Sequence, residues 1–201
     1  MTFAEKIAPS HTALLVIDMQ RDYFQEGGII DRMGFDYGAV HTIIEPLADF
    51  VARARPLVRL TIFTQQTRLP CMQSPAVVEH YTRAGMARPF DPAMEGFFGV
   101  TPVDGDIIIQ KPKYSAFIAT GLDGILRASQ IQTLIMTGVA TNVCVESAAR
   151  QAFMLDYHVV VPRDLTAGVN EEFKEWSLRN IAAFFGEVVE SARILEAWQT
   201  D

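Results

Sequence analysis

Short apolar runs, each ended by polar or turn-forming residues, alternate along this chain with segments of helical periodicity. The run Ala13–Ile17 has no polar residue, which is typical of a strand buried on both faces of a parallel sheet. Alternating strands and helices favour an α/β fold. We therefore predict three α/β/α layers around a doubly wound, mainly parallel sheet of about six strands. The expected strands are Ala13–Ile17, Leu57–Phe63, Asp106–Gln110, Thr133–Met136, Tyr157–Val161 and Val188–Val189.

The segments between these strands carry apolar residues three or four positions apart, the spacing of one face of a helix. The stretch from Thr64 to Gly105 differs, because it holds several prolines and glycines and one short expected helix. Long ordered loops of this kind tend to be lids or binding surfaces, and this one could cover a ligand or contact a neighbouring subunit. The expected helices are Tyr37–Ala54, Ala76–Ala84, Leu122–Ala128, a helix from Val143 onward, Glu171–Phe185 and Ala192–Trp198.

Composition suits one domain and disfavours several kinds of partner. With 201 residues, 49% of them hydrophobic, residues 1–201 are expected to form a single domain. The net charge of −7 and the pI near 5.1 argue against nucleic acid or an acidic membrane as a partner. No apolar run approaches the roughly 20 residues that span a bilayer. The start of the chain lacks the pattern of a signal peptide, so a cytoplasmic location is expected.

The stretch from Leu134 to Asp156 places a cysteine just after an expected strand. Gly138 breaks the strand, and Asn142 then has the residue type of a helix N-cap. Cys144 would lie in the first helical turn, where unpaired backbone N–H groups favour an anion. This position predicts a lowered pKa for the Cys144 thiol and a nucleophilic thiolate. A buried structural cysteine is the alternative, because free cysteine packs as a small apolar residue.

Three residues that could act together follow three of the expected strands: Asp18, Lys111 and Cys144. In a doubly wound sheet these strand ends meet along one edge, where ligands bind. Lys111 would stabilise a Cys144 thiolate there, and Asp18 would carry the proton, which together make a hydrolytic group. Each residue also has a structural interpretation, since Asp18 could cap the following segment and Lys111 could be a solvated charge. The combination of all three favours catalysis.

Three motifs occur in order along the chain: Leu14–Gln20 with Asp22 and Phe24 following, Lys111–Phe117, and Thr137–Ser147. In these motifs and their rough spacing the chain resembles the isochorismatase-like cysteine hydrolases, over nearly its whole length. The resemblance implies a catalytic triad of Asp18, Lys111 and Cys144. It also implies a cis peptide before Ala140 and an oxyanion hole formed by the backbone N–H groups of Ala140 and Cys144.

The resemblance also narrows the chemistry. The isochorismatases that gave the family its name lack the cysteine, so Cys144 argues against vinyl-ether hydrolysis. The nicotinamidase branch carries an Asp-x-His metal pair after the second strand, whereas this chain has Thr64-Gln65-Gln66-Thr67-Arg68 there. The histidines are scattered and show no ligand spacing, so we predict no metal and no cofactor. They are His11, His41, His80 and His158.

The second and third motifs are most similar to amidohydrolases of ureido and carbamoyl compounds, such as ureidoacrylate and biuret hydrolases. This likeness implies that Cys144 cleaves a C–N amide bond of a small-molecule substrate through a thioacyl-enzyme intermediate. Such substrates are flat and rich in amides, so aromatic residues could flank them and amide or guanidinium groups could hydrogen-bond them. Core packing and a solvated loop are the structural alternatives. The candidate substrate-binding residues are Phe24, Gln65, Tyr114 and Phe117, with Gln66 and Arg68 as further donors.

Two other functions compete with this interpretation. A nicotinamidase- or maleamate-type amidase would have the same triad and a different pocket. A redox or scaffold protein would need no triad, and Cys144 would then be only oxidised or buried. A homo-oligomer, either a dimer or a tetramer, is expected from the family and from apolar residues expected on the surface. These residues are Phe184, Phe185 and Trp198.

Overall fold

A computed structural model describes residues 1–87 and 91–199 of the chain. Within these residues one sheet contains seven strands, and every neighbouring pair of them is parallel. The predicted α/β fold with a parallel sheet is therefore confirmed. The strands are β1 Thr12–Ile17, β2 Leu60–Gln66, β3 Ile107–Lys111, β4 Thr133–Val139, β5 His158–Pro162, β6 Thr166–Ala167 and β7 Glu187–Val189.

The order of the strands fixes where a ligand can bind. The sheet runs β3-β2-β1-β4-β5-β7, and the short β6 pairs with β4. The order therefore reverses between β1 and β4, and a crevice forms beyond the carboxyl ends of the strands at such a point. Ile17 at the end of β1 pairs with Gly138 near the end of β4. The chain segments that follow these two strands thus emerge side by side at the crevice.

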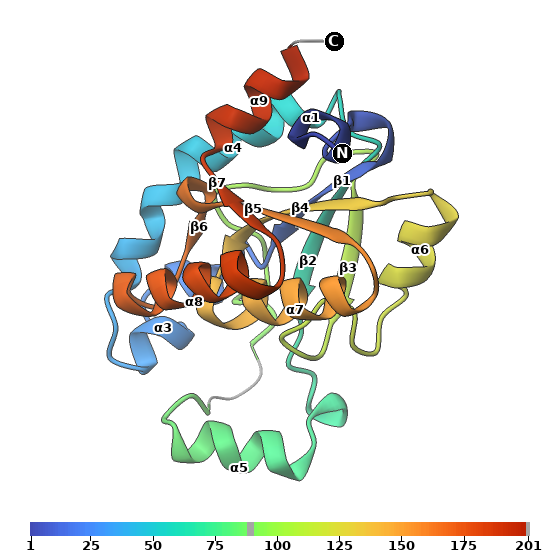
Figure 1. Cartoon of the computed structure of the whole chain (residues 1–201). Coiled ribbons are helices and arrows are strands. Elements are labelled where there is room, and N and C mark those ends of the chain that lie inside the picture. Colours follow the sequence, from blue (N-terminus) through green and yellow to red (C-terminus); the bar gives the residue numbers. More distant parts are fainter. Residues whose placement is uncertain (88–90, 200–201) are drawn as a thin grey trace.

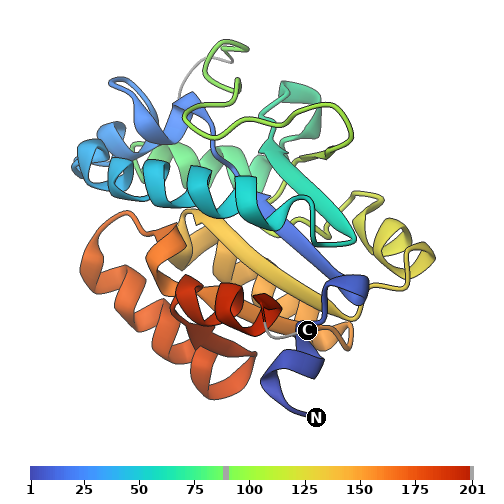
Figure 2. The same cartoon turned by 90° about the horizontal axis from the view of Figure 1, so that it is seen from above.

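Helices cover both faces of the sheet and complete three layers (Figures 1 and 2). Alternate residues of β1 face alternate layers, so Leu14 and Val16 pack in one core and Leu15 and Ile17 in the other. This explains why β1 is apolar from Ala13 to Ile17. On the first face lie α4 Ile44–Ala54 and α9 Ser191–Gln199, and on the second lie α6 Leu122–Ala128, α7 Glu146–Met154 and α8 Glu171–Phe184.

Local sequence signals set the helix starts. Asn170 accepts a hydrogen bond from the backbone N–H of Phe173 at 2.7 Å and so caps α8. Ser74 caps α5 (Pro75–Arg83) in the same way, with a proline at the first helical position. The shorter segments are α1 Phe3–Lys6, α2 Arg21–Phe24, α3 Ile29–Arg32, the 3₁₀ turns η1 Pro9–His11, η2 Tyr37–Ile43, η3 Pro70–Met72 and η5 Arg163–Leu165, and the π-helical turn η4 Thr141–Val145.

Several predicted boundaries are wrong, and the second strand is the most informative case. It was expected at Leu57–Phe63, but it runs three residues further, because Gln65 and Gln66 continue the ladder with β3. Polar residues can extend this strand because its end borders a polar site. The helix expected over Tyr37–Ala54 begins as the 3₁₀ turn η2 and becomes α-helical only at Ile44. The two-residue β6 was missed because so short a strand has no readable period.

The connection between β2 and β3 holds α5, which stands away from the two helical layers in Figure 1. The stretch from Thr64 to Gly105 is called the excursion below. It includes residues 88–90, which lie outside the described residues. Further along, the chain returns to the end of β1, where Phe97 forms an antiparallel bridge with Gln20. The backbone N–H of Asp22 also donates to the carbonyl of Met94 at 2.9 Å. Backbone hydrogen bonds thus connect the excursion to the loop that follows β1.

Two of the three aromatic residues expected on the surface are partly covered. Phe184 is exposed, but Phe185 is half-buried against Phe153, at a ring-centroid distance of 5.9 Å. Trp198 packs on the first core, and its indole N–H donates to the carbonyl of Ile7 at 2.8 Å. The expected exposure is therefore wrong for Phe185 and Trp198. In the described part of the chain, no helix combines the length and the apolar character needed to cross a membrane.

Candidate active site

Asp18 is the first residue beyond β1, where the chain turns sharply with a positive φ of 51°. Aspartate tolerates this left-handed conformation better than most residues. Its side chain is fully buried, and the hydroxyl of Thr64 donates to Oδ1 at 2.6 Å. The ammonium of Lys111 lies 2.7 Å from Oδ2. Both oxygens of the carboxylate therefore have a defined neighbour.

Lys111 is the last residue of β3 and is buried, whereas the sequence suggested a position beyond the strand. Besides Asp18, its ammonium contacts the carbonyls of Lys113 at 3.1 Å and Tyr114 at 3.0 Å. Three oxygen neighbours match the three N–H donors of an ammonium. Burial on its own would lower the pKa of Lys111, but the charges of Asp18 and Cys144 raise it overall. The lysine is therefore held in its charged form.

Cys144 lies in the π-helical turn η4, which leads directly into α7. Its side chain is buried, and the thiol donates to Oε1 of Gln66 at 3.5 Å. Burial raises the pKa of the thiol to about 12, although the nearby charge of Lys111 lowers it. The negative charge of Asp18 raises it further. The expected low thiol pKa is therefore wrong for this resting state, because loss of water outweighs the favourable charges.

The turn between β4 and Cys144 has an unusual backbone. The peptide bond between Val139 and Ala140 is cis, as the resemblance implied. Gly138 has a φ of 95°, and a Cβ built there would lie 2.1 Å from the carbonyl oxygen of Ile17. Only glycine allows β4 to approach β1 this closely. The carbonyl of Ala140 then accepts hydrogen bonds from the backbone N–H groups of Val143 at 3.0 Å and Val145 at 3.2 Å.

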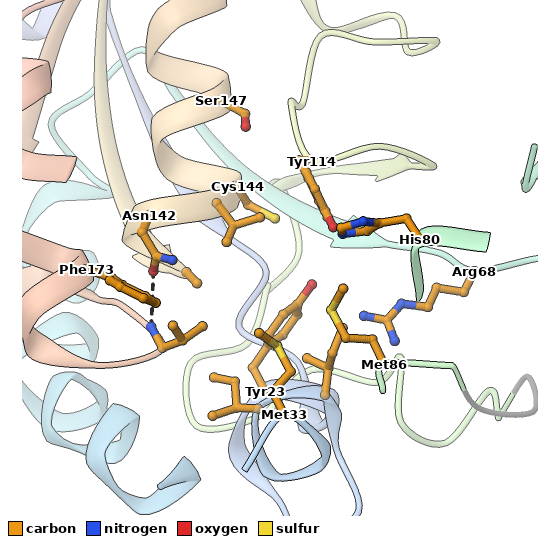
Figure 3. Close-up of a pocket in the computed structure, with 15 residues that line it drawn as sticks. Tyr23, Met33, Arg68, His80, Met86, Tyr114, Asn142, Cys144, Ser147 and Phe173 are labelled. Carbon is orange, nitrogen blue, oxygen red and sulfur yellow. Dashed lines mark hydrogen bonds between the residues drawn. The ribbon is translucent and has the colours of Figure 1, made fainter. Parts of the chain in front are cut away.

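Asn142 does not cap the helix of Cys144. Its Oδ1 accepts a hydrogen bond from the backbone N–H of Val169 at 3.1 Å, drawn as a dashed line in Figure 3. The N-cap position is instead occupied by Ala140, which has no side-chain acceptor. The N-cap prediction was wrong because the helix starts as a π turn, which moves its first residue. Asn142 links the cysteine turn to the segment after β6.

Gln66, which was predicted only as a further hydrogen-bond donor, is an acceptor beside Cys144. Its Oε1 accepts a hydrogen bond from the hydroxyl of Tyr23 at 2.7 Å, in addition to the contact with Cys144. In the sheet register Gln66 pairs with Lys111 on β3, so the two side chains lie on the same face. Gln65 is one residue earlier and projects to the opposite face. The strand period would have identified Gln66 once Lys111 was taken as a site residue.

Cys144 opens onto a cavity of about 340 Å³ between η4, the excursion and the loop after β1 (Figure 3). The walls are largely apolar, with a few polar groups among them, as in many sites for small molecules. The residues that line the cavity are Tyr23, Ile29, Ile30, Met33, Arg68, His80, Met86, Tyr114, Ala140, Asn142, Val143, Cys144, Ser147, Val169 and Phe173.

Of the four candidate substrate-binding residues Phe24, Gln65, Tyr114 and Phe117, only Tyr114 lines this cavity. Phe24 is buried in the first core, where its ring stacks on that of Phe98 at 5.5 Å. Phe117 packs in the second core against Tyr157. Gln65 donates to the carbonyl of Glu95 at 2.9 Å. The expectation that Phe24, Phe117 and Gln65 face the ligand is thus corrected, because sheet register and core packing turn them away.

Comparison with known proteins gives a consistent result. A family model of the isochorismatase domain matches residues 12–193. The ureidoacrylate amidohydrolase RutB of Enterobacter sp. (strain 638) is 37% identical to this chain in an alignment 209 residues long, which covers 94% of this chain and 90% of the relative.

Two solved structures have the same fold as this chain. The cysteine hydrolase of Pseudomonas syringae pv. phaseolicola 1448A superposes with a TM-score of 0.82 at 24% identity and covers 97% of this chain and 95% of its own. The isochorismatase-like hydrolase of Alkaliphilus metalliredigens superposes with a TM-score of 0.77 at 27% identity, and the match covers 93% of this chain and 98% of that one.

Proposed function

The chain belongs to the isochorismatase family, and on this premise we propose that it is a cysteine-dependent amidohydrolase of small ureido or carbamoyl compounds. The observation that carries the proposal is the buried ion pair of Asp18 and Lys111 beside a cysteine that opens onto a small cavity. A cysteine that was only structural would not need a buried carboxylate and a buried ammonium, since both cost free energy to desolvate.

The first half of the proposed reaction forms a thioacyl enzyme, which is a thiocarbamate when the substrate is a ureido or carbamoyl compound. Because burial keeps the thiol protonated, Asp18 takes the proton of Cys144 as the sulfur attacks the carbonyl carbon of the substrate. The oxygen then carries a negative charge, which the backbone N–H groups of Ala140 and Cys144 stabilise. One such donor can contribute about 2.7–4 kcal/mol to the transition state. The C–N bond breaks as Asp18 gives its proton to the leaving nitrogen, which departs as an amine or as ammonia.

The second half of the reaction releases the acyl group. Asp18, again a carboxylate, takes a proton from a water molecule as the water oxygen attacks the carbonyl carbon of the thioacyl enzyme. The C–S bond breaks, and the proton returns to the sulfur of Cys144. Lys111 stabilises the anionic forms of both partners throughout, since its pKa is raised and it stays charged. The sum is hydrolysis of one amide bond with no redox change.

The relatives and the size of the cavity support a ureido or carbamoyl substrate. The curated relatives named as ureidoacrylate amidohydrolases are about as long as this chain, and the first of them is 37% identical to it. A cavity of about 340 Å³ is large enough for a small ureido or carbamoyl compound. Nicotinamidase- and maleamate-type amidases would use the same three catalytic residues, so the substrate has to be tested directly.

Ammonia release from a panel of amides tests the proposal. We expect turnover of ureidoacrylate, biuret or N-carbamoyl amino acids in preference to nicotinamide and maleamate. The Cys144→Ala variant should lose at least about 1,000-fold in kcat/KM, as expected when a nucleophile is removed. Cys71→Ser is the matched control, because Cys71 is the exposed cysteine, and it should keep full activity. Activity of Cys144→Ala within tenfold of wild type would remove the cysteine from the mechanism.

A further inference from the structure

One wall of the cavity holds a buried cation that the proposed mechanism does not use. Arg68 follows β2 and lines the cavity together with Cys144, and Figure 3 shows its guanidinium pointing inward. Only 8% of the residue is exposed. Among the fifteen described residues that line the cavity there is no aspartate or glutamate, and Arg68 is the one permanently charged side chain of these fifteen. The cavity surface therefore favours an anion on the side of Arg68.

The guanidinium has hydrogen-bonding capacity to spare. Its Nη1 lies 3.0 Å from Oδ2 of Asp22, and this ion pair fixes its position. Nη1 is itself buried, however, and makes no hydrogen bond to any of the described residues. A guanidinium carries five N–H donors, and a buried donor without an acceptor is costly. Two planar carboxylates can approach different edges of the same guanidinium.

Other contacts keep Arg68 in place and charged. Its backbone N–H donates to Oε1 of Glu95 at 2.6 Å, and the guanidinium lies over the ring of Tyr81 at 5.4 Å. Burial on its own would lower the pKa of Arg68, but Tyr23 and Asp22 raise it overall. The tyrosine hydroxyls nearby are neutral donors, because burial raises the pKa of both Tyr23 and Tyr114. The wall is thus a rigid cationic surface with neutral hydroxyl groups around it.

From this arrangement we propose that Arg68 binds a carboxylate at the end of the substrate remote from the scissile bond. The substrates of choice are then ureido or carbamoyl acids, with the amide carbonyl at Cys144 and the carboxylate at Arg68. Asp22 positions the guanidinium when the site is empty, and the substrate supplies the second anion. This inference rests on the proposed amidohydrolase function and names the substrate class within it.

The test compares an anionic substrate with a neutral one of similar shape. The pair is 3-ureidopropionate and 3-methylbutylurea, in which an isopropyl group replaces the carboxylate. Wild type should prefer the acid in kcat/KM. Arg68→Gln should lower kcat/KM for the acid by about 10- to 100-fold, the range for a hydrogen bond to a charged group, and change it by less than about threefold for the neutral urea. Arg53→Gln, at an exposed arginine on α4, is the control and should change neither value.

A binding measurement separates this inference from the proposed function. Calorimetry of 3-ureidopropionate with Cys144→Ala reports binding without turnover, and adding Arg68→Gln to that variant should weaken binding by a similar factor. Weaker binding on adding Arg68→Gln, together with a wild type that has no amidase activity, would support carboxylate binding by Arg68 and contradict the proposed amidohydrolase function. If wild type is active and Arg68→Gln reduces both substrates equally, Arg68 only supports the fold and the inference is overturned.

Two further variants distinguish a loss of carboxylate binding from a loss of folding. Arg68→Gln removes the ion pair between Arg68 and the buried Asp22, which can destabilise the protein. The double variant Asp22→Asn, Arg68→Gln removes both charges together and should show the same selective loss for the acid. Arg68→Lys keeps the positive charge but loses the planar fork, and we expect it to retain an intermediate preference for the acid. A double variant that still prefers the acid as wild type does would overturn the proposal.

Discussion

The Asp18 carboxylate and the Lys111 ammonium lie 2.7 Å apart, and neither side chain is exposed to solvent. They come from the ends of β1 and β3, and β2 lies between these two strands in the sheet. Thr64 on β2 completes the contact by donating to the second oxygen of Asp18. Because two desolvated charges are stable only while both remain paired, the pair of Asp18, the proposed proton carrier, and Lys111 also holds the strand ends together.

Removing one partner of this pair should therefore damage folding as well as activity. We expect Lys111→Met to lower the free energy of unfolding by about 3–5 kcal/mol, the usual cost of leaving one buried charge alone. The double variant Asp18→Asn, Lys111→Met should recover much of that stability and none of the activity. Urea denaturation of the three proteins measures this. Equal stability of Lys111→Met and wild type would mean that the pair is not buried in solution.

The Cys144 thiol should become reactive only as the pH rises. With a pKa of about 12, its thiolate fraction grows roughly tenfold per pH unit through neutral pH, and alkylation by iodoacetamide should follow. Asp18 raises this pKa through its charge and its hydrogen bond, so Asp18→Asn should lower it and shift the profile to lower pH. Lys111 lowers the pKa, so Lys111→Met should shift the profile the other way.

Mass spectrometry in a Cys71→Ser background isolates the reaction of Cys144. A wild-type rate that is already constant below pH 8 would contradict the high thiol pKa. It would instead support the lowered thiol pKa that was predicted from the position of Cys144 in the first helical turn.

Gln66 should matter for catalysis and its neighbour Gln65 should not. Gln66→Leu removes the acceptor of both Tyr23 and Cys144, and kcat/KM should fall by about tenfold or more. It also leaves the Tyr23 hydroxyl buried without its acceptor, which should cost about 1–3 kcal/mol of stability. Gln65→Leu is the matched control on the opposite face of the strand. Equal losses for the two variants would show that neither side chain acts specifically at the site.

Gly138 should not tolerate any side chain. A Cβ at this position would lie 2.1 Å from the Ile17 carbonyl oxygen, and the φ of 95° is strained for alanine. We expect Gly138→Ala to cost at least about 3 kcal/mol and to reduce soluble expression. Gly105→Ala is a suitable control, since it also has a positive φ but has open space around its Cβ. A stable, active Gly138→Ala would mean that β1 and β4 can separate at this point.

Chelation should leave the activity intact. Among the described residues no group of three or more His, Cys, Asp or Glu side chains could hold a metal ion, and the proposed mechanism needs none. We expect full turnover after dialysis against a strong chelator. Activity that is lost on dialysis and restored by zinc would contradict a metal-free mechanism.

A homo-oligomer remains expected, and light scattering on the purified protein measures it. Large apolar side chains stay exposed on α7 and α8, including Met154, Trp176 and Phe184. A dimer or tetramer should persist at micromolar concentration. A monomer at that concentration would mean that this exposed surface is not an interface between copies of the chain.

Elements with strong local signals were predicted well from the sequence. The apolar run of β1 and the helical spacing of Leu122, Ile125 and Leu126 in α6 indicate a buried strand and a short helix, because period and propensity are properties of neighbouring residues. The motifs around Asp18, Lys111 and Cys144 also marked three strand ends that the fold brings to one edge. These parts depend on local sequence and on the general geometry of parallel sheets.

Side-chain direction and burial were decided only by the tertiary structure. Whether Gln65 or Gln66 faces the cysteine depends on the pairing of β2 with β3, and a shift of one residue reverses it. The pKa of the Cys144 thiol rises because other segments of the chain exclude water from it. Arg68 lines the cavity where Asp22 and Glu95, which are far from it in the sequence, contact it. The sequence alone determined which residues stand at the ends of the strands. Register and desolvation, which involve residues far apart in the chain, decided what those residues can do.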